Sequence, residues 1–173
     1  MSKLQRYIFL SLLIAGAMVL SIIESMIPLP FIAPGAKLGL TNIVTLTVLM
    51  IFGFKDAMLV SALRCILLMF VAGNPISFIY SIISGISSVV AMYISCKYFS
   101  KYLSLIGISV LGAMTHNASQ ITVAAIMFEN LNMYTYLPIM SLVSIFTGCF
   151  VGYTTIYIVE NLNKNILKLK REV

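Results

Sequence analysis

Residues 7–27 read YIFLSLLIAGAMVLSIIESMI, a run in which Glu24 alone is charged. About 20 apolar residues in a helix are enough to cross the hydrocarbon core of a bilayer. Lys3 and Arg6 precede the run, as in a signal peptide, but the apolar part of a signal peptide spans only about 7–15 residues. We therefore expect an uncleaved transmembrane helix that ends before Pro28.

Five further apolar runs follow, at residues 39–54, 57–72, 76–95, 103–128 and 138–159. Of the 173 residues, 61% are hydrophobic and 9% are charged, against about 25% charged in an average soluble domain. So few charges cannot cover the surface of a soluble fold of this size. This excludes a soluble enzyme, a nucleic-acid-binding protein and a disordered chain. We expect an all-α fold, in which residues 1–173 form one integral membrane bundle of six transmembrane helices.

Basic residues are distributed unevenly between the two sides of this bundle. With the N-terminus inside, nine Lys and Arg residues fall in inner segments, whereas the outer loops hold Lys37. The inner residues are Lys3, Arg6, Lys55, Lys97, Lys101, Lys164, Lys168, Lys170 and Arg171. Because cytoplasmic loops of membrane proteins carry an excess of Lys and Arg, we expect both termini to be cytoplasmic. This arrangement requires an even number of spans.

Three ionisable side chains lie inside the expected spans, where each costs on the order of 2.5–3.5 kcal/mol to insert. Arg64 lies near the middle of the third run, His116 near the middle of the fifth, and Glu24 close to the outer end of the first. The planar guanidinium of Arg64 suits a carboxylate or phosphate ligand. The alternative is a structural role, with Arg64 paired to Glu24 or to backbone carbonyls.

The stretch GAMTHNASQ at residues 112–120 is the most polar part of any span. His116 and Gln120 are one helical turn apart and share a face, and Asn117 lies beside them. Such a face either lines a polar pocket or joins helices by hydrogen bonds. Because this helix offers one histidine and no nearby carboxylate, we expect no metal, and no cofactor.

Two stretches are distinctive together: PGAKLGLTNIV at residues 34–44 and GAMTHNASQ at residues 112–120. With six spans in so short a chain, they resemble the Gx transporter family, also called heptaprenyl diphosphate synthase component I. That family is similar to the S-components of energy-coupling factor transporters, six-helix proteins with an outward-facing pocket closed by the loop between the first two helices. The resemblance implies that residues 34–44 close over the solute, with Lys37 and Asn42 near it.

The resemblance also implies partners. In S-components, small residues of the first helix meet a membrane subunit, and the matching candidates here are Ser11, Ala15, Ala17 and Ser21. We expect a small-molecule substrate, surrounding membrane lipid, a transmembrane coupling subunit and ATPase subunits, but no nucleic acid. The setting would be the plasma membrane of a bacterium, with this chain as a multi-pass protein. The residues expected to bind the solute are Arg64, His116, Asn117, Gln120, Lys37, Asn42 and Glu24.

The second family label is enzymatic and leaves an alternative open. It implies a membrane accessory component in the synthesis of isoprenoid or menaquinone precursors. Prenyl diphosphate synthases resemble one another in two aspartate-rich motifs that hold Mg²⁺, but this chain has a single aspartate, Asp56, in an inner turn where it can cap the third span. Since no nucleophile–base set appears either, we expect no catalytic residues.

The charge distribution predicts that the loops after the first and fifth spans lie outside. Ala33→Cys and Asn132→Cys, each placed in a background lacking Cys65, Cys96 and Cys149, should react with a membrane-impermeant maleimide added to intact cells. Labelling of both positions only from the cytoplasmic side would overturn this orientation.

Overall fold

The computed structural model describes residues 3–26, 39–73 and 75–171, and for Ala72 and residues 163–171 only their backbone is considered. Within these ranges there are six α-helices, one 3₁₀ helix and no strand. The elements are α1 (Lys3–Ser25), α2 (Asn42–Phe52), α3 (Phe54–Ala72), α4 (Pro75–Phe99), α5 (Leu105–Met127), η1 (Leu131–Tyr136) and α6 (Leu137–Arg171). The expected all-α, six-helix fold is confirmed.

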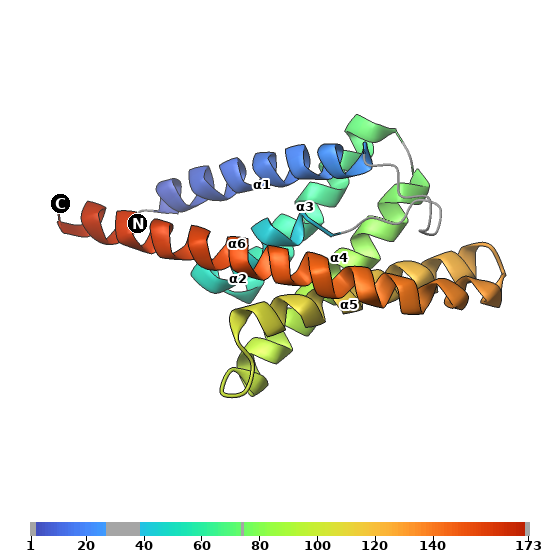
Figure 1. Cartoon of the computed structure of the whole chain (residues 1–173). Coiled ribbons are helices and arrows are strands. Elements are labelled where there is room, and N and C mark those ends of the chain that lie inside the picture. Colours follow the sequence, from blue (N-terminus) through green and yellow to red (C-terminus); the bar gives the residue numbers. More distant parts are fainter. Residues whose placement is uncertain (1–2, 27–38, 74, 172–173) are drawn as a thin grey trace.

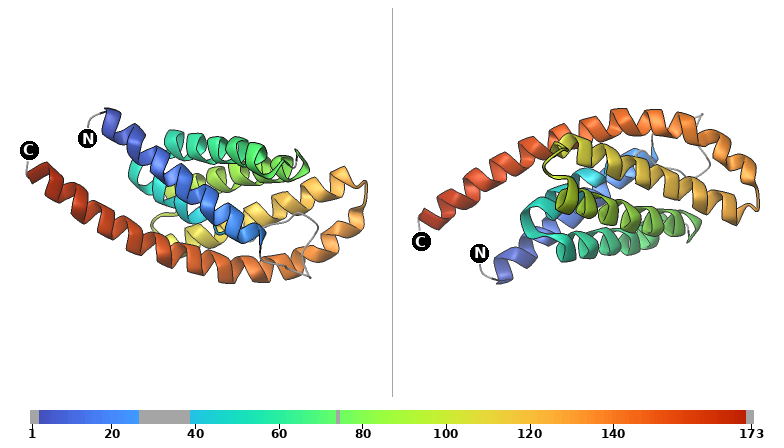
Figure 2. Two further views of the ribbon diagram at one scale, coloured as in Figure 1. Left: turned by 90° about the horizontal axis from the view of Figure 1, so that it is seen from above. Right: turned by 90° about the horizontal axis from the view of Figure 1, so that it is seen from below.

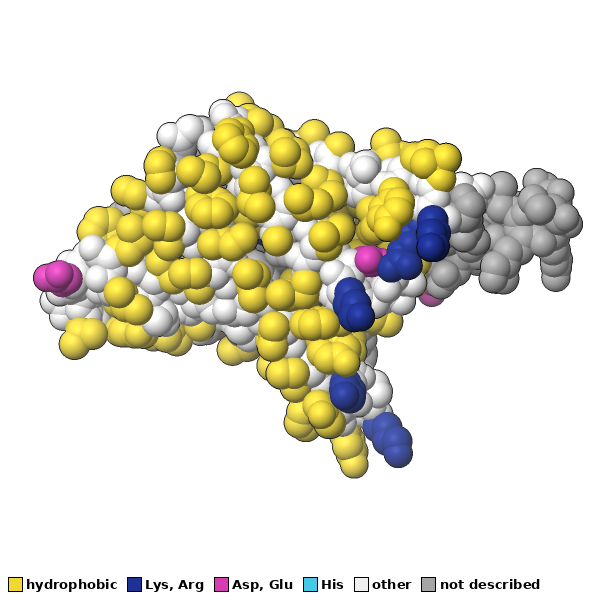
Figure 3. All heavy atoms as spheres, turned by 180° about the vertical axis from the view of Figure 1, so that it is seen from behind, with side chains coloured by type: hydrophobic (Ala, Val, Ile, Leu, Met, Phe, Trp, Pro, Cys, Tyr) yellow, Lys and Arg dark blue, Asp and Glu magenta, His cyan; other side chains and the backbone are white. Residues whose placement is uncertain are grey.

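The helices run back and forth between two ends of the molecule (Figures 1 and 2). The start of α1 and the end of α6 lie at the same end, as an even number of spans requires. Lys and Arg side chains gather toward one end in the space-filling view, and a mostly apolar surface extends away from them (Figure 3). Which end faces the cytoplasm stays a prediction from the charge count.

Among the described residues, three helical stretches are long and apolar enough to cross a membrane: Lys3–Ser25, Pro75–Phe99 and Leu131–Leu162. α2 is a shorter apolar helix of 11 residues. α3 carries Arg64, and α5 carries the polar stretch around His116. Both of these polar side chains are buried, because a polar group inside a bilayer is tolerated where it faces the bundle interior.

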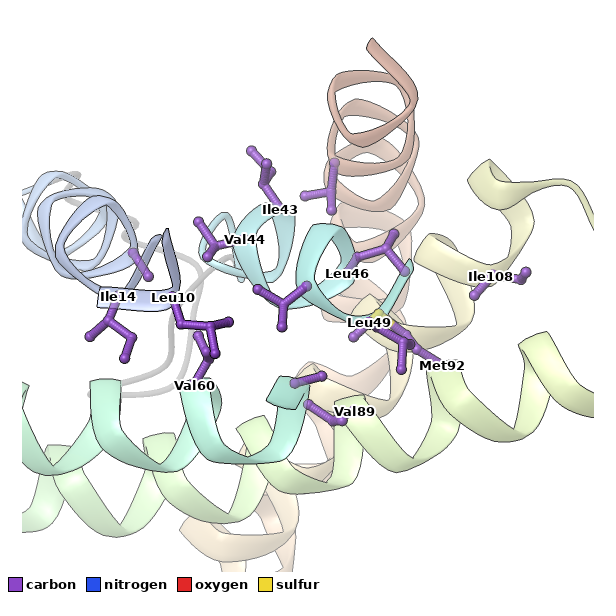
Figure 4. Packing of buried hydrophobic residues seen from close by; sticks show 14 residues of the cluster. Leu10, Ile14, Ile43, Val44, Leu46, Leu49, Val60, Val89, Met92 and Ile108 are labelled. Carbon is purple, nitrogen blue, oxygen red and sulfur yellow. The ribbon is translucent and has the colours of Figure 1, made fainter. Parts of the chain in front are cut away.

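α2 is the central helix of the bundle. It contacts α1, α3, α4, α5 and α6, and every residue from 41 to 49 is buried. Its side chains point toward the surrounding helices, with Leu46 and Leu49 near Met92 of α4 (Figure 4). A helix that is apolar on all sides is suited to such a position. Because lipid tails are as apolar as leucine, close packing rather than water exclusion holds these helices together.

Several helix boundaries differ from the expected ones, and three of these differences change the interpretation of the chain. α2 begins at Asn42 rather than at residue 39, and α6 continues to Arg171 rather than stopping near residue 159. No Gly or Pro follows residue 152, so nothing in the tail ends the helix where the apolar run ends. α3 starts at Phe54, with Gly53 as its N-cap at φ 89°.

Asp56 therefore does not cap α3, and the expectation that it does is wrong. It lies in the first turn of α3 and accepts hydrogen bonds from Arg6 of α1, with Arg6 Nε 3.0 Å from Asp56 Oδ2 and a second contact from Nη2. The Asp56 side chain is only 12% exposed. This ion pair ties the start of α1 to the start of α3, and the charge count had placed both residues on the inner side.

α5 and α6 form the most extensive helix pair. Their backbones approach closely at two glycines one turn apart: a Cβ atom at Gly148 would lie 2.6 Å from Val110 Cα, and one at Gly152 would lie 2.7 Å from Ile106 Cα. Small residues spaced by four are typical of close helix contacts in membranes. Gly148 and Gly152 are therefore a close-contact pair on α6, separate from the small residues of the first helix.

Gly148→Ala should destabilise the protein, because its methyl group would push the α5 backbone away. The expected loss is about 1–3 kcal/mol, the usual cost of overpacking. Gly16→Ala on α1 is the matched control, since a Cβ there meets nothing within 4 Å and Ala favours the helix. Unfolding by sodium dodecyl sulfate in mixed micelles measures both variants. Equal stability of the two would contradict the close contact.

Candidate functional site

Polar groups from several helices meet at the turn that leads into α2, which we call the α2 turn (residues 39–42). Glu24 of α1 is 3% exposed. Its Oε1 accepts the backbone N–H of Gly39 and that of Leu40, the latter at 3.4 Å. α2 begins two residues later, at Asn42, so the positive end of its dipole lies close to this carboxylate. The two N–H groups and the nearby helix dipole together stabilise the buried Glu24 carboxylate.

Arg64 reaches the α2 turn from α3. Its Nη1 donates to Thr41 Oγ1, and its Nη2 lies 3.7 Å from Cys65 Sγ. Nε is buried and has no hydrogen-bond partner among the described residues. Arg64 and Glu24 therefore hold neighbouring residues of the same turn. The guanidinium retains an unused donor, and a buried donor without an acceptor costs about 1–3 kcal/mol, and more when it is charged.

His116 of α5 lies on the other side of the α2 turn. A Cβ atom at Gly39 would lie 3.3 Å from His116 Cδ2 and 3.0 Å from Asn42 Nδ2. The ring is joined to its own helix by a 3.0 Å contact between its Nε2 and Gln120 Nε2. Asn42 Nδ2 is buried without a hydrogen-bond partner in the described part of the chain. It is a second unused donor at this turn.

Asn117 faces a different neighbour. Its Nδ2 donates to Ser144 Oγ at 2.7 Å and approaches the Met140 carbonyl at 3.5 Å, so it joins α5 to α6. The adjacent Thr115 and Ser119 line an open groove between α4, α5 and α6. The polar residues of α5 therefore lie in three places. Some contact α6, some line the outer groove, and His116 lies at the α2 turn.

A cavity of about 380 Å³ lies between α1, α3 and α4. Its lining includes Ser21, Cys65, Leu68, Phe78 and Ser81. Cys65 connects it to the site described above, because its sulfur lies beside the Arg64 guanidinium. This cavity was not predicted from the sequence, because most of its lining surface is apolar. The available signal was the recurrence of serines within the first and fourth apolar runs.

The structure thus brings together five of the seven residues expected to bind the solute. Glu24, Asn42, Arg64 and His116 surround the α2 turn, and Gln120 joins them through His116. Asn117 belongs to the contact between α5 and α6 instead. Lys37 lies outside the described residues.

The expected partner face of α1 is divided by the structure. Ser11 and Ala15 are exposed, whereas Ala17 and Ser21 are buried in the bundle. The buried side chains of α1 recur every three or four residues, and Ala17 and Ser21 belong to that inward stripe. Ala17 and Ser21 pack inside the bundle, so the expectation that they face a partner subunit is wrong.

The family model for heptaprenyl diphosphate synthase component I matches residues 13–158, a range that contains both distinctive stretches. The chain belongs to this family. A solved structure described as the S component of a bacterial ECF transporter is similar to it, with a TM-score of 0.58 and 20% identity over 97% of this chain and 98% of that chain. No curated protein matches the chain. This member of the component I family therefore has the S-component fold.

Gly39→Ala tests the crowding around the α2 turn, and Gly53→Ala is its matched control. The two glycines share a positive φ, 86° and 89°, so alanine should be strained at both positions, by about 1–3 kcal/mol. Only at Gly39 does a Cβ also meet neighbours. Gly39→Ala should therefore lower the unfolding midpoint further than Gly53→Ala. An equal shift would show that His116 and Asn42 do not crowd this position.

Proposed function

We propose that this protein is a substrate-binding membrane subunit that takes up a small anionic solute from outside and passes it inward with ATP-driven partner subunits. The observation that carries the proposal is the buried guanidinium of Arg64, whose Nε has no hydrogen-bond partner among the described residues. The unused amide donor of Asn42 lies at the same turn. An anionic solute would supply the acceptors that these two donors lack.

The charges at the α2 turn favour an anion. Glu24 is already stabilised by the N–H groups of Gly39 and Leu40, so Arg64 keeps its charge for a ligand. Thr41, its neutral hydrogen-bond partner, orients the guanidinium without neutralising it. A carboxylate or phosphate can accept two parallel hydrogen bonds from such a group. His116 and Gln120 would then contact uncharged parts of the same solute.

The proposal includes partners and a setting. The likeness to the S component of an ECF transporter supports a transmembrane coupling subunit and ATPase subunits as partners, in a bacterial plasma membrane. The exposed side of α1, with Ser11 and Ala15, is the proposed contact for the coupling subunit. Solute binding by this chain alone would precede transport by the complex.

The family name favours a second candidate, an accessory membrane component of prenyl diphosphate synthesis. Metal-dependent prenyl transfer by this chain itself is disfavoured, because its single aspartate, Asp56, forms an ion pair with Arg6. Vesicle uptake separates the candidates. Uptake of the small molecule that co-purifies with the protein, identified by mass spectrometry, should require this chain and an ATPase module. Loss of prenyl chain elongation without this chain, with uptake unchanged, would favour the accessory role.

Arg64→Ala should weaken binding of the co-purifying molecule by about 1.5–3 kcal/mol, the scale of a hydrogen bond to a charged group. Arg64→Lys should restore part of the affinity, because an ammonium group lacks the planar fork. Glu24→Gln should instead lower thermal stability, since Glu24 holds the α2 turn, with Glu160→Gln at an exposed position as its control. Calorimetry and thermal unfolding measure the two effects. Full affinity in Arg64→Ala would exclude the binding role.

A further inference from the structure

The cavity between α1, α3 and α4 has a buried floor and an exposed mouth. Ser21 and Cys65 are each 1% exposed, and Ser81 is 6% exposed. Toward the mouth the lining includes the apolar Ile22, at 40% exposure, and Val71, at 62%, beside the exposed Ser25 and the half-buried Ser77. Such a cavity accepts a ligand that is polar at one end and apolar along its body.

The floor of this cavity adjoins the guanidinium of Arg64. Arg64 Nη2 lies 3.7 Å from Cys65 Sγ. Across the contact between α3 and α4, a Cβ atom at Gly85 would lie 2.8 Å from Ser61 Oγ and 3.3 Å from Arg64 Nη2. Glycine at position 85 therefore lets the α4 backbone approach the guanidinium closely. The positive charge lies directly behind the floor.

Two hydroxyl groups on the floor have unused hydrogen-bonding capacity. Within the described parts of the chain the hydroxyls of Ser21 and Ser81 make no hydrogen bond, although the Ser81 carbonyl accepts one from Ser84 Oγ at 3.4 Å. By contrast, Ser84 and Ser87 on α4 donate to the carbonyls of Tyr80 and Ile83 in their own helix. Together with Arg64 Nε, which also lacks a partner among the described residues, these hydroxyls supply donors that an acidic group could use.

We propose that this cavity binds a single-chain anionic amphiphile, with its acidic group on the floor at Ser21 and Ser81, next to the Arg64 guanidinium, and its apolar body along Leu68 and Phe78. The inference rests on the proposed solute-binding role of Arg64 and adds the class of solute. A neutral lipid tail would leave the donors on the floor unused. A small hydrophilic anion would gain nothing from the apolar walls.

The chain contains no tryptophan, so Phe78→Trp places a single indole fluorophore in the cavity. The probes are a medium-chain fatty acid brominated at its terminal carbon and the methyl ester of the same acid, added to the protein in phosphatidylcholine nanodiscs. Bromine quenches indole fluorescence on contact. The acid should quench saturably, at a concentration at least tenfold lower than the ester. Phe146→Trp, at a 76% exposed position on α6, is the control and should be quenched alike by both probes. Equal quenching by acid and ester at position 78 would overturn the proposal.

Two further variants in the Phe78→Trp background test the floor. Arg64→Ala should raise the acid concentration needed for half-quenching at least tenfold. Ser81→Leu should do the same while retaining Arg64, which keeps the test valid if Arg64→Ala does not fold. Ser87→Leu is the matched control, because Ser87 lies outside the cavity lining, and its quenching should be unchanged. Unchanged quenching in Ser81→Leu would place the acid elsewhere and overturn the proposal.

This result is separable from that of the uptake experiment, because quenching needs no partner subunit. If quenching is not selective for the acid but uptake of the co-purifying molecule is intact, only the proposed amphiphile site is rejected. Saturable, acid-selective quenching without uptake would support the cavity as a binding site and remove the transport function.

Discussion

The structure depends on how the buried start of a central helix is satisfied. α2 begins inside the bundle, where Thr41 and Asn42 are only 2% and 3% exposed, so its first N–H groups must find acceptors in the protein. Those of Asn42, Ile43 and Val44 bond to the carbonyls of residues 39–41. The Glu24 carboxylate accepts the N–H groups of Gly39 and Leu40, which precede the helix, and this contact fixes the end of α1 against the α2 turn. Arg64 and His116 then pack around the same turn from α3 and α5. The site is thus assembled by the element that most needs polar partners.

Much of this arrangement was predictable from sequence, because a bilayer leaves few choices. The apolar runs predicted six helices, and the cost of charge in lipid identified Glu24, Arg64 and His116, all of which lie at the α2 turn. The sequence did not show toward which neighbouring helix each side chain points. Asn117 is adjacent to His116, yet it bonds to Ser144 on α6, and Ala17 faces the core although Ala15 does not. These orientations follow from neighbours distant in the chain.

Long-range pairing was equally hidden. Arg6 and Asp56 are separated by 50 residues, and local rules assigned Asp56 to a helix cap instead. The cavity between α1, α3 and α4 likewise arises from side chains that are unremarkable in their own segments. Residue type alone identified the ionisable side chains that are costly to place in lipid. The cavity, in contrast, depends on how α1, α3 and α4 pack against one another.

The complete burial of α2 limits which substitutions the chain can accept. Positions 41–49 have no face toward lipid, so each change of side-chain volume must be absorbed by another helix. Substitution is therefore constrained along this whole segment. A change of volume at residues 41–49 needs a compensating change on one of the helices that α2 contacts, namely α1, α3, α4, α5 and α6. A helix that is buried on all sides thus tolerates few independent substitutions along a short stretch of sequence.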